Sequence, residues 1–228
     1  MITPLRINDL SVTLGNTAVL HGVDLVVSPG ETVALLGANG SGKTTLLRAA
    51  LGLVPHTSGN VQLFDVPLNR FRDWQQVGYV PQHGSMNVLK ATVLETVRSG
   101  RIARQGFFHH PTTADREAVD KALQIVRMND LAHCELADLS SGQRQRAMVA
   151  RALAGEPELL LLDEPLAGLD MRSQEALAAI LAELKTTGLT SCVVLHELGS
   201  FEPLLDRSVV LREGRVIYSG KLAGDTHV

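Results

Sequence analysis

The octapeptide GANGSGKT, from Gly37 to Thr44, constrains the fold of this chain more than any other stretch. It matches the P-loop pattern G-x-x-x-x-G-K-[ST], in which a glycine-rich turn wraps around phosphate groups. The apolar residues Val33 to Leu36 before it predict a buried strand, and a helical pattern runs from Lys43 until Gly52 ends it. A strand, a phosphate-binding turn and a helix in this order predict an α/β fold.

The residues of this loop have separate predicted roles. The backbone N–H groups of Gly40 to Thr44 cradle the β-phosphate of a nucleotide, and the glycines permit the tight turn. Lys43 reaches the β- and γ-phosphates as a point charge, and the hydroxyl of Thr44 is a ligand of Mg²⁺. A chance glycine-rich turn is the structural alternative, which the complete pattern disfavours. The predicted nucleotide-binding residues are Gly37, Ala38, Asn39, Gly40, Ser41, Gly42, Lys43, Thr44 and Thr45.

Two carboxylates, Asp163 and Glu164, directly follow the apolar run from Leu159 to Leu162. A strand this apolar has no solvated face, as expected where helices cover both sides of a parallel sheet. Ligands of such sheets bind at the C-terminal ends of the strands, so both carboxylates are expected beside the P-loop. Asp163 is predicted to hold Mg²⁺, and Glu164 to orient and polarise an attacking water. Alone, the pair is equally consistent with solvated carboxylates at a strand end.

Two other strand ends carry weaker signals. His196 ends the apolar strand VVLH, where a histidine is more often structural than functional. Gln82 follows VGYVP, and a lone glutamine there is usually only a polar strand terminus.

A second anion site is predicted where the stretch ADLSSGQRQRAMVARAL begins a helix. Leu139 is expected to pack, Ser140 and Ser141 can cap the helix, and Gly142 allows another group to approach the backbone. The unpaired N–H groups and the positive dipole end of such a helix favour a phosphate.

Strands and helices alternate at both ends of the chain, with a mostly helical stretch between them. Residues 59–68 and 76–82 predict short strands. The clearest amphipathic segment is 115–128, which places four apolar residues on one face: Ala118, Ala122, Ile125 and Val126.

The C-terminal third continues the alternation. Asp170 can cap a helix that Gly188 ends, and 191–197 predicts another buried strand. Residues 207–220 predict a hairpin that turns at Glu213-Gly214. The expected buried stripe of the helix consists of Leu177, Ile180, Leu181 and Leu184.

The composition excludes several classes of protein. The 228 residues are 45% hydrophobic, which is enough for the core of one domain with a subdomain. A net charge of −3 and an aromatic content of 4% argue against a nucleic-acid partner. Two cysteines without metal-like spacing indicate a reducing compartment. Neither a signal peptide nor an apolar run of about 20 residues is visible, so a cytoplasmic location is expected.

Taken in order, these motifs resemble the ATP-binding subunit of ABC transporters over nearly the whole chain. After the P-loop, YVPQ at Gln82 resembles the Q-loop, and LSSGQ from Leu139 to Gln143 resembles the signature. LLLLDEP from Leu159 to Pro165 precedes AGLD, which resembles a D-loop ending at Asp170, and His196 stands in the place of the switch histidine.

The resemblance implies a fold. It is a P-loop NTPase core with a mostly parallel sheet, an antiparallel β subdomain and a helical insertion subdomain. The whole chain, 1–228, is then a single ABC ATPase domain, with the helical subdomain over about 84–156.

The resemblance also implies shared sites, because in this family each ATP lies between the P-loop of one subunit and the signature of the other. The signature residues Ser140, Ser141, Gly142 and Gln143 are thereby assigned to ATP held by a partner subunit, with Ser140, Gly142 and Gln143 on its γ-phosphate. The complete set of motifs favours a homodimer. The implied catalytic residues are Glu164, His196 and Lys43, the Mg²⁺ residues are Thr44, Gln82 and Asp163, and the D-loop residue is Asp170.

Two residues depart from the family pattern. Ser141 replaces the usual second glycine of the signature, which a turn of small residues tolerates. Leu14 occupies the place of the aromatic residue that stacks on adenine, which predicts modest nucleotide affinity and weak discrimination between bases.

Within this family, the chain resembles the zinc and manganese uptake branch through GFF..P..ADREAV, LSSGQRQRAMVARALA and LLLLDEPLAGLD followed by SQEAL. This resemblance implies membrane permease subunits as partners, an extracytoplasmic metal-binding protein acting indirectly, and a peripheral location on the cytoplasmic face of the membrane. An ABC ATPase for another cargo and a soluble ABC ATPase without a transport role remain as alternatives. The adjacent His109 and His110 lack a third ligand at suitable spacing, which disfavours a metal site. Phe107 and Phe108 either pack or dock a permease.

Overall fold

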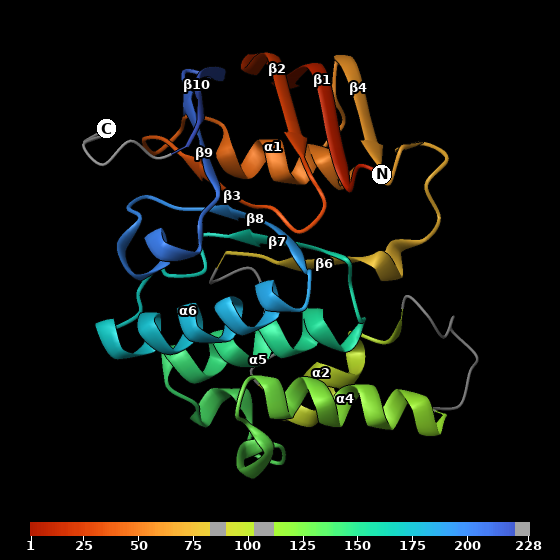
Figure 1. Cartoon of the computed structure of the whole chain (residues 1–228), viewed down its shortest axis with the longest axis vertical. Coiled ribbons are helices and arrows are strands. Elements are labelled where there is room, and N and C mark those ends of the chain that lie inside the picture. Colours follow the sequence, from red (N-terminus) through yellow and green to blue (C-terminus); the bar gives the residue numbers. More distant parts are fainter. Residues whose placement is uncertain (83–89, 103–111, 222–228) are drawn as a thin grey trace.

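The computed structural model describes residues 1–82, 90–102 and 112–221, which form two sheets flanked by helices (Figure 1). The first sheet is antiparallel, in the order β2-β1-β4-β5. The second has the order β10-β9-β3-β8-β7-β6, with the strands from β9 to β6 parallel and β10 antiparallel to β9. The strands are β1 (Leu5–Leu14), β2 (Thr17–Val27), β3 (Thr32–Leu36), β4 (Ser58–Leu63), β5 (Val66–Pro67), β6 (Val77–Val80), β7 (Leu159–Asp163), β8 (Thr190–Val194), β9 (Arg207–Arg212) and β10 (Arg215–Gly220).

The helices lie in separate layers (Figure 1). One helix, α1, lies between the antiparallel sheet and the six-stranded sheet, and the other helices cover the opposite face of the six-stranded sheet. They are α1 (Lys43–Ala50), α2 (Val93–Ser99), α4 (Thr113–Ile125), α5 (Ser141–Ala154) and α6 (Met171–Thr186). Short 3-10 helices cover Trp74–Gln76, Asn129–Leu131, Leu136–Asp138 and Gly199–Leu204.

The central strands are apolar throughout because both of their faces are covered. Every residue of β3, β7 and β8 is buried. Along β3 the side chains alternate: Val33 and Leu35 join the core around α1, whereas Ala34 and Leu36 join the core around α5 and α6. The predicted mostly parallel core and antiparallel sheet are confirmed.

The three helices α2, α4 and α5 each begin with a capping box, in which the N-cap side chain and a residue three positions later bond each other's backbone. On α4, Ala118 and Ala122 are buried and Ile125 is half-buried, which confirms the predicted face. Phe107, Phe108, His109 and His110 lie outside the described residues, so the predictions about them stay predictions.

A buried arginine joins the ends of these helices. Arg101, directly after α2, is 5% exposed. Its guanidinium donates to Asp115 of α4 at 2.8 Å and to the carbonyl of Ala154 at 2.9 Å, and it pairs with Glu156 at 2.9 Å. A buried charge is tolerated only when its partners surround it, so this cluster holds the three helices at one relative position.

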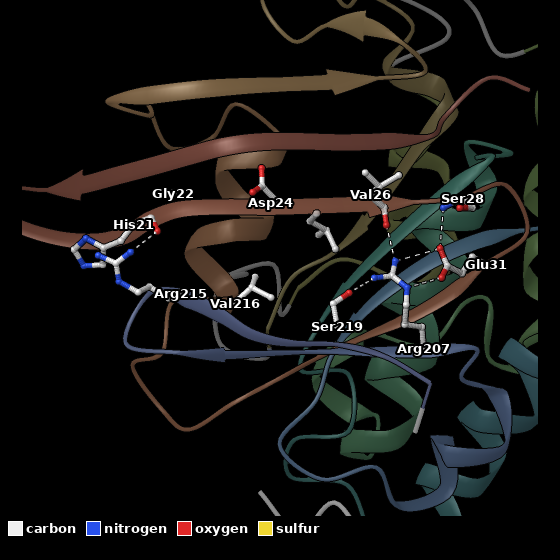
Figure 2. Close-up of a pocket in the computed structure, with 11 residues that line it drawn as sticks. His21, Gly22, Asp24, Val26, Ser28, Glu31, Arg207, Arg215, Val216 and Ser219 are labelled. Atoms are coloured by element: carbon white, nitrogen blue, oxygen red, sulfur yellow. Dashed lines mark hydrogen bonds and ion pairs between the residues drawn. The ribbon is translucent and has the colours of Figure 1, made fainter. Parts of the chain in front are cut away.

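The hairpin of β9 and β10 turns at Glu213-Gly214, as predicted, and both residues have the positive φ that favours such turns. At its open end, Arg207 ties the two sheets together: it donates to Glu31 at 2.8 Å, to the carbonyl of Val26 at 2.6 Å and to Ser219 at 2.8 Å (Figure 2). These residues line a cavity of about 680 Å³ between β2 and β10, which none of the predicted nucleotide-binding residues lines.

None of the helices within 1–82, 90–102 and 112–221 combines the length and the apolar character needed to cross a bilayer.

Candidate nucleotide site

The P-loop connects the end of β3 to the start of α1. Gly37, Gly40 and Gly42 have φ of 146°, 79° and 103°, a region that side-chain-bearing residues rarely adopt. Gly42 is the N-cap of α1 and provides no side-chain cap. The first N–H groups of α1 are therefore open to an anion at the positive end of the helix dipole.

Two of these glycines are also required by close packing. A Cβ at Gly37 would overlap the carbonyl oxygen of Leu211 on β9, and one at Gly42 would lie 2.6 Å from Leu20 Cδ2 on β2. The turn of the β9–β10 hairpin supports the loop directly, since Gly214 N donates to the carbonyl of Ser41 at 3.1 Å. The conformation of the loop is therefore held by its neighbours.

Lys43 is buried and points back into the loop. Its Nζ donates to the carbonyls of Gly37 at 2.6 Å and Ala38 at 3.0 Å. Burial lowers the pKa of Lys43, and the carboxylates of Glu164 and Asp163 oppose this shift. A bound phosphate is a stronger partner for the ammonium than a carbonyl, so Lys43 is placed to exchange one for the other.

Thr44 and Asp163, predicted as Mg²⁺ residues, are in contact. Thr44 Oγ1 donates to Asp163 Oδ1 at 2.8 Å, and Asp163 is fully buried. Burial raises the pKa of Asp163, and the hydrogen bond from Thr44 and the charge of Arg48 oppose the rise. A hydroxyl and a carboxylate are hard oxygen donors, and a Mg²⁺ ion completes such a set with phosphate oxygens and water.

The loop also offers an unsatisfied group. Ser41 Oγ is buried and has no hydrogen-bond partner in the part of the chain that the structure describes. Buried polar atoms are nearly always paired, so an unpaired hydroxyl inside a P-loop fits a role in binding phosphate. Among the described residues, no group of three or more histidine, cysteine, aspartate or glutamate side chains forms a metal site.

Glu164 follows β7 directly and has a φ of 50°, a backbone conformation that is uncommon for residues other than glycine. Gln82 Nε2 donates to Glu164 Oε2 at 2.6 Å, and His196 Nε2 lies 2.9 Å from Glu164 Oε1. The structure thus brings together three residues predicted from three different strand ends. Glu164 and His196 also line a cavity of about 180 Å³ with Gln174.

The second predicted anion site lies at the start of α5. Ser140 is the N-cap, with its Oγ accepting from Gln143 N at 3.2 Å and its N donating to Gln143 Oε1 at 2.9 Å. Ser141 is the first helical residue rather than a cap, so that part of the prediction is wrong. Ser140 is exposed, and Leu139 is buried as predicted.

Asp170 is the N-cap of α6, as predicted. Its carboxylate accepts from Ser173 N at 2.9 Å and from Ser173 Oγ at 3.0 Å. These two hydrogen bonds lower the pKa of the exposed Asp170 carboxyl. The helix buries Leu177, Ile180, Leu181 and Leu184 and ends before Gly188, also as predicted.

Leu14 is the last residue of β1 and is 44% exposed. Its side chain is therefore partly open to solvent at the place where the family resemblance puts an aromatic ring.

Tyr79 was not predicted as part of the site. Its hydroxyl donates to Asp163 Oδ2 in a long hydrogen bond of 3.4 Å, and burial raises its pKa. The contact depends on the parallel pairing of β6 with β7, in which Tyr79 stands opposite Leu161. In the sequence, Tyr79 is only an aromatic residue in a short strand, and such a residue is usually expected to pack against its neighbours.

Comparison with known proteins gives consistent results. The sequence matches the family described as ABC transporter over residues 20–167. It is 35% identical over 219 residues to the zinc uptake system ATP-binding protein ZurA of Listeria innocua, which covers 95% of this chain and 85% of that protein. It is also 35% identical over 216 residues to the manganese transport system ATP-binding protein MntB of Bacillus subtilis, covering 94% and 86%.

Solved structures share the fold. A nucleotide-free ATP-binding cassette from an ABC transporter has a TM-score of 0.87 at 23% identity and covers 98% of this chain and 92% of its own. A dimeric bacterial ABC transporter cassette has a TM-score of 0.84 at 27% identity and covers 97% and 100%.

Proposed function

This chain belongs to the ABC transporter family as an ATPase subunit, and from this premise we propose that it energises zinc or manganese uptake through a separate membrane permease. The observation that supports zinc or manganese as the transported metal is the 35% identity, over nearly the whole chain, to ATP-binding proteins named for zinc uptake and manganese transport. On this proposal the chain is one ABC ATPase domain with a helical subdomain over about 84–156, peripheral on the cytoplasmic face of the membrane.

The proposed binding chemistry uses the P-loop. The N–H groups of Gly40 to Thr44 hold the β-phosphate, and Lys43 leaves its carbonyl partners to contact the β- and γ-phosphates. Thr44 and Asp163, with Gln82, hold Mg²⁺, which when bound neutralises charge on the phosphates.

The proposed hydrolytic step uses Glu164. Its carboxylate orients and polarises the attacking water, and its position is fixed by His196 on one oxygen. His196 then contacts the γ-phosphate, where an imidazole N–H stabilises the developing charge. In-line attack by this water on the γ-phosphorus breaks the bond to the β-phosphate oxygen and releases ADP and inorganic phosphate.

We propose that two copies share their ATP sites. The start of α5, with Ser140 exposed at the positive end of a helix dipole, supports a contact with the γ-phosphate of ATP on a partner copy. Ser141, Gly142 and Gln143 complete this contact, and Asp170 lies at the same interface. A structural relative that is a dimeric cassette supports this arrangement.

The test is metal accumulation in metal-starved host cells that lack this gene. Cells complemented with the wild-type chain are expected to recover zinc or manganese, and cells with Glu164→Gln are not. Glu175→Gln, at an exposed glutamate of α6, is the matched control and is expected to restore uptake. If accumulation of both metals is unchanged after deletion, with redundant systems also removed, the proposal that this chain energises zinc or manganese uptake is rejected. The assignment as an ATPase subunit is not affected by that result.

A further inference from the structure

Gly142, in the first turn of α5, has an ordinary helical backbone, unlike the glycines of the P-loop. Conformational freedom therefore does not explain a glycine at this position. The lack of space beside it explains the glycine, because a Cβ at Gly142 would overlap Ser173 Oγ and lie 2.7 Å from Ser173 Cβ. Because Ser173 Cβ is fixed by the backbone of α6, no rotation of the Ser173 side chain relieves this second contact.

Ser173 also holds Asp170. Its N and Oγ donate to the two carboxylate oxygens of Asp170 at 2.9 and 3.0 Å. One side chain thus fills the space beside Gly142 and fastens the residue that caps α6. Ser140 and Asp170 are both exposed, and each lies within three residues of this contact.

We propose that Ser173 is a positioning residue, which locks the start of α6 against the start of α5 so that Ser140 and Asp170 face a partner copy as one rigid unit. The glycine at 142 is then needed for contact within the chain. Close-packed interiors transmit such a constraint because an added methyl group displaces the neighbouring backbone. The functional half of this inference rests on the proposed sharing of ATP between two copies.

The experiment combines substitutions at the two positions in a Glu164→Gln background, where ATP-bound dimers are expected to accumulate. Gly142→Ala is expected to lower Tm by roughly 2–12 °C and to weaken ATP-driven dimerisation by at least about tenfold. Adding Ser173→Gly makes room for the new methyl group and keeps the backbone N–H bond to Asp170 but removes the Oγ bond, so it is expected to restore most of the Tm and only part of the dimerisation. Adding Ser173→Ala is not, because it leaves the Cβ in place. Gly155→Ala, at the other end of α5 with no contact closer than 3.4 Å, is the control and is expected to leave dimerisation unchanged.

Rescue by Ser173→Gly but not by Ser173→Ala supports the proposal. Equal failure of both double variants to recover Tm overturns it. Recovery of Tm with no recovery of dimerisation also overturns the proposal. In that case the glycine at 142 would be needed to make room for the partner's nucleotide, and not to make room for Ser173. If Glu164→Gln alone forms no dimer with ATP and Mg²⁺, the shared-site function fails, and the Tm measurements still decide whether Ser173 and Gly142 are coupled.

Discussion

Gln82 and Glu164 are joined by a hydrogen bond of 2.6 Å between Nε2 and Oε2, although they are 82 positions apart in the chain. The other oxygen of Glu164 lies 2.9 Å from His196. Both oxygens of the proposed water-orienting carboxylate are therefore occupied in this conformation. A carboxylate oxygen accepts more than one hydrogen bond, so these two partners hold the Glu164 side chain in place and still leave acceptor sites for a water.

Glu164→Gln is expected to slow ATP turnover by about 10²–10⁴-fold, because an amide cannot accept a proton from water in the transition state. The substitution is nearly isosteric, so ATP still binds and a dimer with trapped ATP accumulates. Phosphate release measures the first effect and light scattering with ATP and Mg²⁺ measures the second. Glu175→Gln serves as the control for both. A Glu164→Gln protein that stays monomeric would count against shared sites in the isolated subunit.

Gly37→Ala and Gly40→Ala are expected to act differently, although both lie in the P-loop. A Cβ at Gly37 overlaps the carbonyl of Leu211, whereas a Cβ at Gly40 meets nothing within 4 Å. Gly37→Ala is therefore expected to lower Tm and to abolish ATP binding together. Gly40→Ala costs only the strain of its positive φ, about 1–2 kcal/mol or roughly 2–8 °C in Tm. Its ATP affinity is expected to fall at least about tenfold because the new methyl group hinders the phosphate.

Thermal unfolding and titration calorimetry separate these two results. If Gly40→Ala destabilises the protein as much as Gly37→Ala, a Cβ at position 40 must meet other atoms, and the predicted difference between the two glycines is wrong.

Leu14→Tyr is expected to tighten ATP binding by about 5–150-fold, the range that corresponds to 1–3 kcal/mol of stacking on a base. Leu14 is 44% exposed at the end of β1, so a larger ring fits there without repacking the core. Titration of ATP into both proteins measures the change. Leu53→Tyr, at a leucine 61% exposed after α1, is the matched control and is expected to have no effect. Equal affinities of wild type and Leu14→Tyr would show that another residue faces the adenine.

Cys192 is expected to resist alkylation in the folded protein, whereas Cys134 reacts. Burial raises the pKa of the Cys192 thiol to about 12, so at pH 8 its reactive thiolate is almost absent. Thiolate forms only as pH rises towards the raised pKa, and burial blocks access as well. Thiol titration is expected to give one reactive cysteine in the native protein and two in denaturant, which matches the two cysteines of the chain. Fast labelling of Cys192 at pH 8 would contradict its burial in β8.

Most of the fold could be predicted because its signals are local. Apolar runs in β3, β7 and β8, the cap at Asp170 and the turn at Glu213-Gly214 each act over a few residues. The failure at Ser141 is also local: two adjacent serines can both cap a helix, and only the backbone conformation selects Ser140.

The contacts within the site could not be predicted, because they depend on which strands are neighbours. Tyr79 reaches Asp163 because β6 pairs with β7. Ser173 reaches Gly142 because α6 begins against the first turn of α5. Neither pair shows any periodicity or spacing in the chain.

By itself, the sequence determined the chemical groups of this protein and the local structures that present them. The P-loop turn, the capped helices and the carboxylates at a strand end follow from residue identity and short-range order. The tertiary structure decided which of these groups meet. The strand order β3-β8-β7-β6 aligns the carboxyl ends of four strands along one edge, and this alignment places Thr44 on Asp163 and both Gln82 and His196 on Glu164. Pairing among strands far apart in sequence is chosen by burial of the whole core, so no single stretch contains it.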